Sequence, residues 1–157
     1  MLKKVISGGQ TGADLGGIRA AQDSGIETGG WIPRNFKTED GYTPSRMSFG
    51  LKETPESTYF PRTSHNARDS DITIWFGDPK SRGGQTTRNA CRRHEKPFLV
   101  YGKDATPDMF AAILRDFAVV NVAGNREGIN PGIEDKTYDT LMQVFKIMDA
   151  AGDVYHA

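Results

Sequence analysis

The chain has 157 residues, which is enough for one domain with a sizeable core. Its 20 basic and 20 acidic residues give a formal net charge of zero, which excludes the strong positive charge typical of nucleic-acid-binding domains. The single cysteine excludes an intramolecular disulfide. No apolar stretch reaches the roughly 20 residues that a membrane helix needs. We therefore expect a single cytoplasmic domain over residues 1–157, without a nucleic-acid or membrane partner.

Short β-branched runs alternate with helical patterns along the chain. The predicted strands are residues 3–7, 71–76, 97–101 and 117–122. The predicted helices are residues 14–24, 86–94, 105–117 and 133–151, and Thr106 is the expected N-cap of the third. This alternation predicts an α/β fold, a Rossmann-like three-layer sandwich with helices on both faces of a mostly parallel sheet.

Residues 29–59 depart from this pattern. They are rich in Gly, Pro, Thr and Ser, and at most one short strand, "GGWIP" (29–33), is expected there. A long irregular stretch in a compact domain is usually functional or mobile. Its carboxylates Glu39, Asp40 and Glu53 are candidates for a general acid or base, and the alternative is that they are solvated loop residues or caps.

The stretch "SGGQTGAD" (7–14) places a glycine-rich loop between the first strand and the first helix. It is not a dinucleotide fingerprint, because Gln10 stands where the second glycine should be. It is not a Walker loop either, because no Lys follows its last glycine. Glycines still allow close backbone approach, and the helix start favours an anion. The alternative is a tight turn with Asp14 as N-cap. The candidate ligand-binding residues are Gly8, Gly9, Gln10, Thr11 and Gly12.

A second stretch, "SRGGQTTRN" (81–89), repeats the Gly-Gly-Gln-Thr pattern after the strand 71–76. We expect a loop that leads into a helix at Thr86 or Thr87. Two such loops can face each other across a crevice that holds an anionic ligand of nucleotide size. The candidate ligand-binding residues here are Arg82, Gly83, Gly84, Gln85, Thr86 and Thr87, and Arg88 could also neutralise charge.

A third loop, "NVAGNREGINPGI" (121–133), follows the last predicted strand. Asn125 and Arg126 are candidate ligand contacts, and Glu127 is a candidate acid, base or loop contact. Asn130 is the expected cap of the last helix, with Pro131 at its first position.

The remaining polar residues indicate structural roles more than catalysis or metal binding. The stretch "RTSHNARDSD" (62–71) places Arg62, Asn66 and Asp69 near one helical face, where they could buttress the glycine loops. The three histidines show no metal-ligand spacing with Cys91, so no metal site is expected. Cys91 is expected to be buried in its helix, and Trp31 could stack on a planar ring or lie in the core.

Taken together, these segments resemble the putative molybdenum carrier family, also described as circularly permuted YpsA-like proteins. The resemblance rests on "SGGQTGAD", "GGWIP", "TEDG", "LKETP", "RTSHNARDSD", "RGGQTTRN", "HEKP" and "NVAGNRE". It implies a Rossmann-like fold related to the DprA and LOG-type nucleotide-binding proteins. It also implies binding of the molybdenum cofactor, a phosphate-bearing pterin, by a homo-oligomer.

Two departures from the related proteins matter. LOG-type hydrolases carry a catalytic glutamate after the glycine pair, and here no Glu follows until Glu95. Asn125 also stands where proline is expected, which we expect to loosen that loop. We therefore predict a non-catalytic carrier of the molybdenum cofactor or of a nucleotide, with no catalytic residue. The alternatives are a nucleotide-processing hydrolase that uses a carboxylate, and a nucleotide-sensing module.

Overall fold

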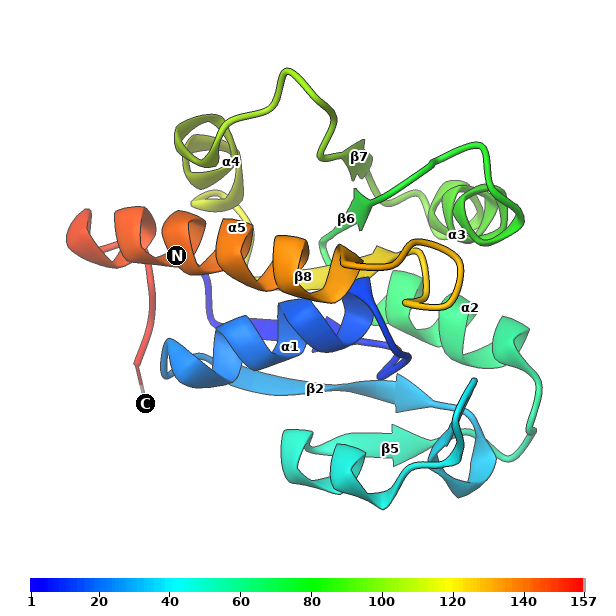
Figure 1. Ribbon diagram of the computed structural model, residues 1–157. Coiled ribbons are helices and arrows are strands. Elements are labelled where there is room, and N and C mark those ends of the chain that lie inside the picture. The colour runs from blue at the N-terminus through cyan, green and yellow to red at the C-terminus, as the bar shows by residue number, and fades with distance from the viewer. Residues whose placement is uncertain (157) are drawn as a thin grey trace.

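The computed structural model describes residues 1–156 and contains a six-stranded sheet in the order β5-β2-β1-β8-β6-β7 (Figure 1). The strands are β1 (Lys4–Ser7), β2 (Glu27–Ile32), β5 (Leu51–Glu53), β6 (Ile72–Phe76), β7 (Phe98–Val100) and β8 (Val119–Gly124). Every neighbouring pair runs parallel. The predicted Rossmann-like α/β fold is confirmed.

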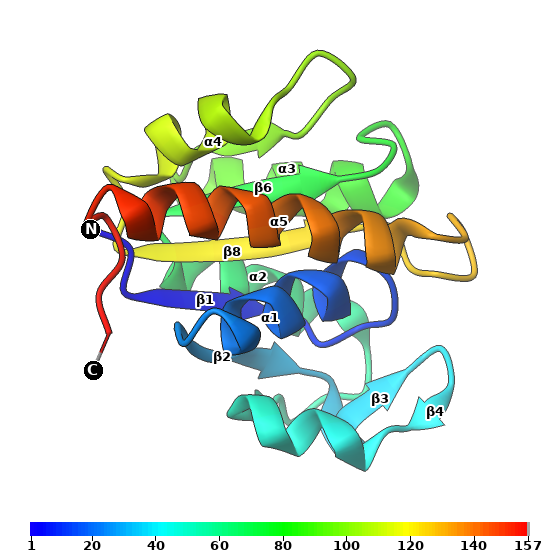
Figure 2. The same cartoon turned by 60° about the vertical axis from the view of Figure 1, so that its left-hand side comes forward.

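Helices cover both faces of this sheet (Figure 2). One layer contains α1 (Ala13–Asp23), α4 (Pro107–Leu114) and α5 (Ile133–Ala150), and the opposite layer contains α2 (Tyr59–Asp69) and α3 (Arg82–Arg93). The larger core lies between the first layer and the sheet and includes Phe76, Leu141 and Phe145. A smaller core on the other face contains Cys91, which is fully buried as predicted. None of the helices in the described chain is long and apolar enough to span a bilayer.

The chain direction makes one end of the sheet the natural place for a ligand. From β1 the chain crosses by α1 to β2, whereas from β6 it crosses by α3 to β7 in the opposite direction. β8 lies between β1 and β6. The loops after β1, β8 and β6 therefore lie next to one another at the carboxyl edge, where strand order reverses and ligands of such sheets bind.

The start of α3 differs from the prediction. The helix begins at Arg82, not at Thr86, because Ser81 is its N-cap and accepts a hydrogen bond from the Gly84 N–H (3.2 Å). Gly83 and Gly84 are therefore helical. Their low helix propensity suggested a loop, but the serine cap determines where the helix starts. The predicted cap Thr106 is confirmed at α4.

The start of α5 also differs. The helix begins at Ile133 with Gly132 at the N-cap position, so the expected cap at Asn130 is wrong. The side chain of Glu127 serves this end instead, because its carboxylate accepts hydrogen bonds from the N–H groups of Gly132 (2.6 Å) and Glu134 (3.0 Å). A carboxylate at this end also interacts favourably with the helix dipole.

Residues 29–59 are more ordered than predicted. They contain the end of β2, a small antiparallel hairpin formed by β3 (Lys37–Thr38) and β4 (Gly41–Tyr42), and β5. Two short 3-10 turns, Arg34–Phe36 and Pro44–Phe49, flank the hairpin. The prediction of at most one short strand is wrong. The β3–β4 hairpin projects beside the carboxyl edge of the sheet (Figure 2).

Candidate anion-binding site

The first glycine loop, residues 8–12, is packed tightly against its neighbours. A Cβ at Gly12 would lie 2.4 Å from the carbonyl oxygen of Asn125, and a Cβ at Gly8 would lie 2.1 Å from Nη1 of Arg62. Gly12 also has a φ of 81°, which L side chains rarely adopt. These glycines let the β8 loop, residues 125–132, and the Arg62 guanidinium come close to the loop backbone.

An internal carboxylate already occupies part of this loop. Asp14 is buried, and its Oδ2 accepts a hydrogen bond from the Gln10 N–H (3.2 Å) and lies 3.4 Å from Nη1 of Arg62. Burial raises the pKa of the Asp14 carboxyl, and the Arg62 charge opposes that shift. Asp14 thus accepts a hydrogen bond from the loop itself and pairs with Arg62, and it is not the N-cap of α1, a position that Gly12 takes.

Only part of the loop backbone is free to bind a ligand. The Gly9 N–H donates to Oγ of Ser7 (3.0 Å), and the Gln10 N–H is held by Asp14. Within the part of the chain that the structure describes, the N–H groups of Thr11 and Gly12 have no hydrogen-bond partner. The donors available to an anion are thus at the end of the loop that faces the β8 loop and the hairpin.

Glu39, from the hairpin, bridges the first glycine loop and the β8 loop. Its Oε1 accepts hydrogen bonds from the Thr11 hydroxyl and from the Gly128 N–H (3.0 Å). The Thr11 bond lowers the pKa of Glu39, and the Gly128 N–H lowers it further. An ionised carboxylate therefore occupies a position where two loops present hydrogen-bond donors, which is the position expected for a ligand anion.

The other candidate acids and bases have structural partners or no evident role. Glu53 accepts a hydrogen bond from the Asn35 N–H (2.6 Å), and Glu127 caps α5. Asp40 is exposed at the hairpin, and its N–H donates to Oγ1 of Thr38 (3.1 Å). These contacts favour the interpretation of these carboxylates as loop and cap residues.

Three cationic side chains surround the ring of Tyr59, at the start of α2. Nζ of Lys37 and Cζ of Arg126 each lie 5.6 Å from the ring centroid, and Cζ of Arg62 lies 5.7 Å from it. Asp14 neutralises Arg62, but no ion pair within residues 1–156 involves Lys37 or Arg126. The first glycine loop therefore has two cations beside it that form no direct ion pair, although the charge of Arg126 does help to lower the pKa of the nearby Glu39 carboxyl.

Two buried polar atoms at the same loop lack partners. Nε2 of Gln10 donates to the carbonyl oxygens of Lys37 (2.9 Å) and Gly8 (3.4 Å), which fixes the orientation of the amide and leaves Oε1 without a donor. Nε of Arg62 likewise has no acceptor. Such atoms each cost about 1–3 kcal/mol when left unpaired. A ligand with ring N–H groups and an anionic oxygen would satisfy both.

The Gly-Gly-Gln-Thr stretch of α3 makes different contacts. The Gln85 amide donates to the Lys80 carbonyl (2.8 Å), and the Thr86 hydroxyl donates to the Arg82 carbonyl (2.9 Å). Gly84 and Thr87 are buried, whereas Arg82 and Gly83 are exposed in the first turn. The Gln85 and Thr86 side chains are therefore hydrogen-bonded to the backbone around the start of α3, whereas Arg82 has no ion-pair partner within residues 1–156.

Asn125 links the loops after β1, β8 and β6. Its Oδ1 accepts a hydrogen bond from the Asp78 N–H (2.8 Å), its Nδ2 donates to Oγ of Ser81 (3.1 Å), and its carbonyl accepts from the Ala13 N–H (3.1 Å). Its side chain is buried. The expectation that Asn125 loosens this loop is wrong, because the amide joins the loop to the start of α3.

The sequence predicted that Arg62, Asn66 and Asp69 of α2 lie near the glycine loops. It did not reveal the role of Tyr59, the ring that three cations surround. Oδ1 of Asn66 accepts a hydrogen bond from the Trp31 N–H (2.8 Å), and Nδ2 of Asn66 donates to the Trp31 carbonyl (3.0 Å). The Trp31 indole N–H donates to Asp69 (2.8 Å). These contacts buttress β2. Neither Tyr59 nor Lys37 belongs to a recognisable sequence motif, and only the folded arrangement brings them to the site.

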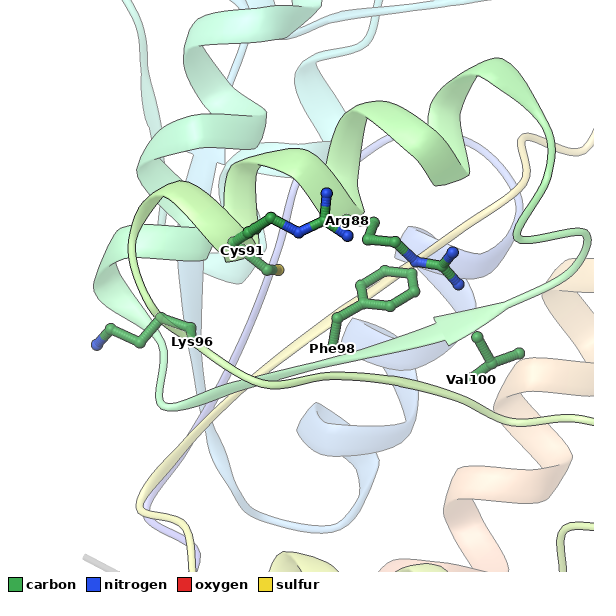
Figure 3. Close-up of a pocket in the computed structure, with 6 residues that line it drawn as sticks. Arg88, Cys91, Lys96, Phe98 and Val100 are labelled. Carbon is green, nitrogen blue, oxygen red and sulfur yellow. The ribbon is translucent and has the colours of Figure 1, made fainter.

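Two hollows on the described surface lie away from the first glycine loop. One, of about 490 Å³, lies between α3 and β7 and is lined by Arg88, Cys91, Arg92, Lys96, Phe98 and Val100 (Figure 3). The other, of about 220 Å³, lies over β1 and β2 and includes Trp31 in its lining. Neither includes any of residues 8–12. No group of three or more His, Cys, Asp or Glu side chains among the described residues is arranged to hold a metal ion.

Comparison with known proteins identifies the family. Residues 5–145 match the model of the circularly permutated YpsA SLOG family. A crystal structure of a protein from Syntrophus aciditrophicus SB, named putative molybdenum carrier protein, superposes with a TM-score of 0.80 at 34% sequence identity, covering 92% of this chain and 94% of that one. A comparison with curated proteins gave no match. The chain therefore belongs to the circularly permutated YpsA SLOG family.

Proposed function

We propose that this protein binds and carries a phosphate-bearing pterin or nucleotide, and that the molybdenum cofactor is its ligand. The observation that carries the proposal is the convergence of Lys37, Arg62 and Arg126 on the Tyr59 ring beside the first glycine loop. Lys37 and Arg126 form no direct ion pair within residues 1–156, so an anion that takes the place of the Glu39 carboxylate would gain charge-assisted hydrogen bonds from them. The name of the structural relative supports the carrier role.

The ligand would use both kinds of group that the loop leaves unpaired. A phosphate would contact the free N–H groups of Thr11 and Gly12, with Arg126 and Lys37 as counter-charges. A pterin or nucleobase would stack near Tyr59 and donate a ring N–H to Oε1 of Gln10. Because no thiolate lies among these residues, recognition would rest on the phosphate and the ring, with the molybdenum as cargo.

Binding requires the hairpin to move. Glu39 holds the Thr11 hydroxyl and the Gly128 N–H, and the backbone of Lys37 covers the Gln10 amide. A phosphate would take over the donors that Glu39 uses, since two anions cannot share them favourably. The ligand would therefore exchange one carboxylate for one phosphate at the junction of the two loops.

Calorimetric titration with isolated molybdenum cofactor, with AMP and with inorganic phosphate tests the proposal. Lys37→Ala and Arg126→Ala should each weaken binding of the cofactor by about tenfold, the expected loss for a charge-assisted hydrogen bond. Arg82→Ala is the matched control, since that exposed arginine lies on α3. If Arg82→Ala abolishes binding and Arg126→Ala leaves it unchanged, the anion binds at α3 and the proposed site is wrong.

The competing function is hydrolysis of an N-glycosidic or phosphate bond, for which Glu39 is the candidate base because it lies at the junction of the two loops. Mass spectrometry of nucleotides and NAD after incubation with the protein separates the two functions. A carrier returns them intact, whereas turnover that Glu39→Ala abolishes would establish an enzyme. We also expect a cytoplasmic homo-oligomer, which light scattering of the purified chain can test.

A further inference from the structure

Strand β7 is an open edge of the sheet. It is the last strand in the order β5-β2-β1-β8-β6-β7 and pairs only with β6. The Pro97 carbonyl accepts a hydrogen bond from the Thr73 N–H (3.0 Å), and the Tyr101 N–H donates to the Trp75 carbonyl (2.9 Å). Because backbone groups alternate in direction along a strand, the N–H and C=O groups of Phe98 and Val100 face away from β6. They are available for pairing with another strand.

A basic hollow lies along this edge. Arg88 and Arg92 of α3 and Lys96 line it together with Phe98 and Val100 (Figure 3). Cζ of Arg88 lies 5.1 Å from the centroid of the Phe98 ring, and Figure 3 shows this side chain extending over the ring toward Val100. No ion pair within residues 1–156 neutralises any of the three cations. The edge thus combines free backbone groups, an apolar ring and excess positive charge.

We infer that this edge binds an extended acidic segment of another protein, which adds to the sheet as a strand beside β7. A peptide backbone can pair with the free groups of Phe98 and Val100, and acidic side chains on the α3 side would meet Arg88, Arg92 and Lys96. The other face of the added strand would lie beside Leu99, which packs against the larger core, so apolar side chains fit there.

The charges argue against a second copy of this chain at the same edge. Two-fold pairing of β7 with β7 would bring the basic residues of both copies together, and like charges opposite each other destabilise paired strands. A nucleic acid would satisfy the cations but could not pair with the strand backbone. The acidic strand is the occupant that uses both features, and the inference holds whatever ligand the first glycine loop binds.

The test uses a fluorescent hexapeptide that alternates glutamate and valine, with fluorescence anisotropy for affinity and amide NMR shifts for location. We expect saturable binding that weakens with salt and shifts the amide signals of Phe98 and Val100. The double variant Arg88→Glu, Arg92→Glu should weaken binding by about tenfold or more. Val100→Pro removes an outward N–H and should weaken it by about fivefold, and edge strands tolerate proline at such positions.

Controls separate strand pairing from simple attraction between charges. Arg115→Glu, an exposed change on another part of the surface, should leave affinity within about twofold. A lysine–valine hexapeptide and an N-methylated glutamate–valine hexapeptide should not bind. Amide spectra of each variant confirm its fold. The inference is overturned if the first peptide fails to bind at millimolar concentration, if the N-methylated peptide binds equally well, or if a single-stranded oligonucleotide alone binds. The basic residues then serve only to guard the edge.

Discussion

Replacing Gly12 by alanine should destabilise the fold by several kcal/mol, although it adds only one methyl group. Two effects combine at this position. The residue has φ 81° and ψ −131°, a conformation that costs a residue with a side chain about 1–3 kcal/mol. The new Cβ would also lie 2.4 Å from the Asn125 carbonyl oxygen and 2.6 Å from the Glu127 nitrogen. Moving the β8 loop back to van der Waals contact adds about 1–3 kcal/mol of overpacking cost.

Gly152→Ala is the matched control for the backbone effect alone. Gly152 follows α5 with φ 76°, and an added Cβ there meets nothing within 4 Å. Its expected cost is only about 1 kcal/mol. The total for Gly12→Ala, about 2–6 kcal/mol, corresponds at its midpoint of about 4 kcal/mol to a Tm lowered by roughly 8–16 °C.

Urea unfolding followed by tryptophan fluorescence measures both variants, because Trp75 is buried in β6 and Trp31 lies in β2. The reasoning predicts that the Gly12 variant loses at least about 1 kcal/mol more than the Gly152 variant. Equal losses within about 0.5 kcal/mol would show that the β8 loop yields without cost, and the close contact between the two loops would then have no energetic importance.

Three further predictions follow from the same contacts. Glu39→Gln removes the negative charge that holds the Thr11 and Gly128 donors. The affinity for inorganic phosphate, measured by calorimetry, should therefore rise by about fivefold. A lower affinity would contradict the exchange of carboxylate for phosphate. Asn125→Ala leaves the Asp78 N–H without its acceptor, so it should lower the free energy of unfolding in urea titrations by about 2–3 kcal/mol. Asn89 is exposed, and Asn89→Ala should change this free energy by less than about 0.5 kcal/mol. The hydrogen bond to Asp149, and to a lesser extent that to the Gly25 carbonyl, raises the pKa of His156. The native protein should therefore have a higher Tm than His156→Ala below about pH 6, and this difference should disappear as the pH rises through the raised pKa. A difference in Tm that does not depend on pH would exclude the linkage.

Strands β1, β6, β7 and β8 of the sheet could be predicted because their signals are local. Strand β6, "ITIWF", is buried at every residue, as expected for a strand covered on both faces. The α4 cap at Thr106 was equally clear, since threonine followed by proline marks a helix start. Strands β3, β4 and β5 were not predicted, because each is only two or three residues long. The errors in helix bounds lie at helix starts where the capping group is distant or unusual. Glu127 caps α5 from five residues before Gly132, and no capping-box spacing reveals it.

The candidate site was harder to predict because its charges come from distant segments. Lys37 lies in a hairpin inside a stretch read as irregular, Tyr59 starts a helix with no side-chain cap, and Arg126 follows β8. Each residue alone is ordinary in sequence. Their convergence depends on the order β5-β2-β1-β8-β6-β7, which places β8 next to β1 although more than a hundred residues separate them. Local periodicity cannot specify such an order.

The repeated Gly-Gly-Gln-Thr pattern shows how one motif acquires two structures. In residues 8–12 Gly12 has a positive φ, and the Gln10 amide spans to the hairpin. In α3 the preceding Ser81 caps the helix, so the glycines become helical and Gln85 turns back to Lys80. The segment before the motif differs between the two copies, because Ser7 ends β1 directly before Gly8, whereas Ser81 caps α3 and Arg82 stands between it and Gly83. The first copy leaves the buried Gln10 Oε1 without a donor, whereas the Gln85 amide of the second copy is bonded to Lys80, and this difference is why we propose the ligand at β1.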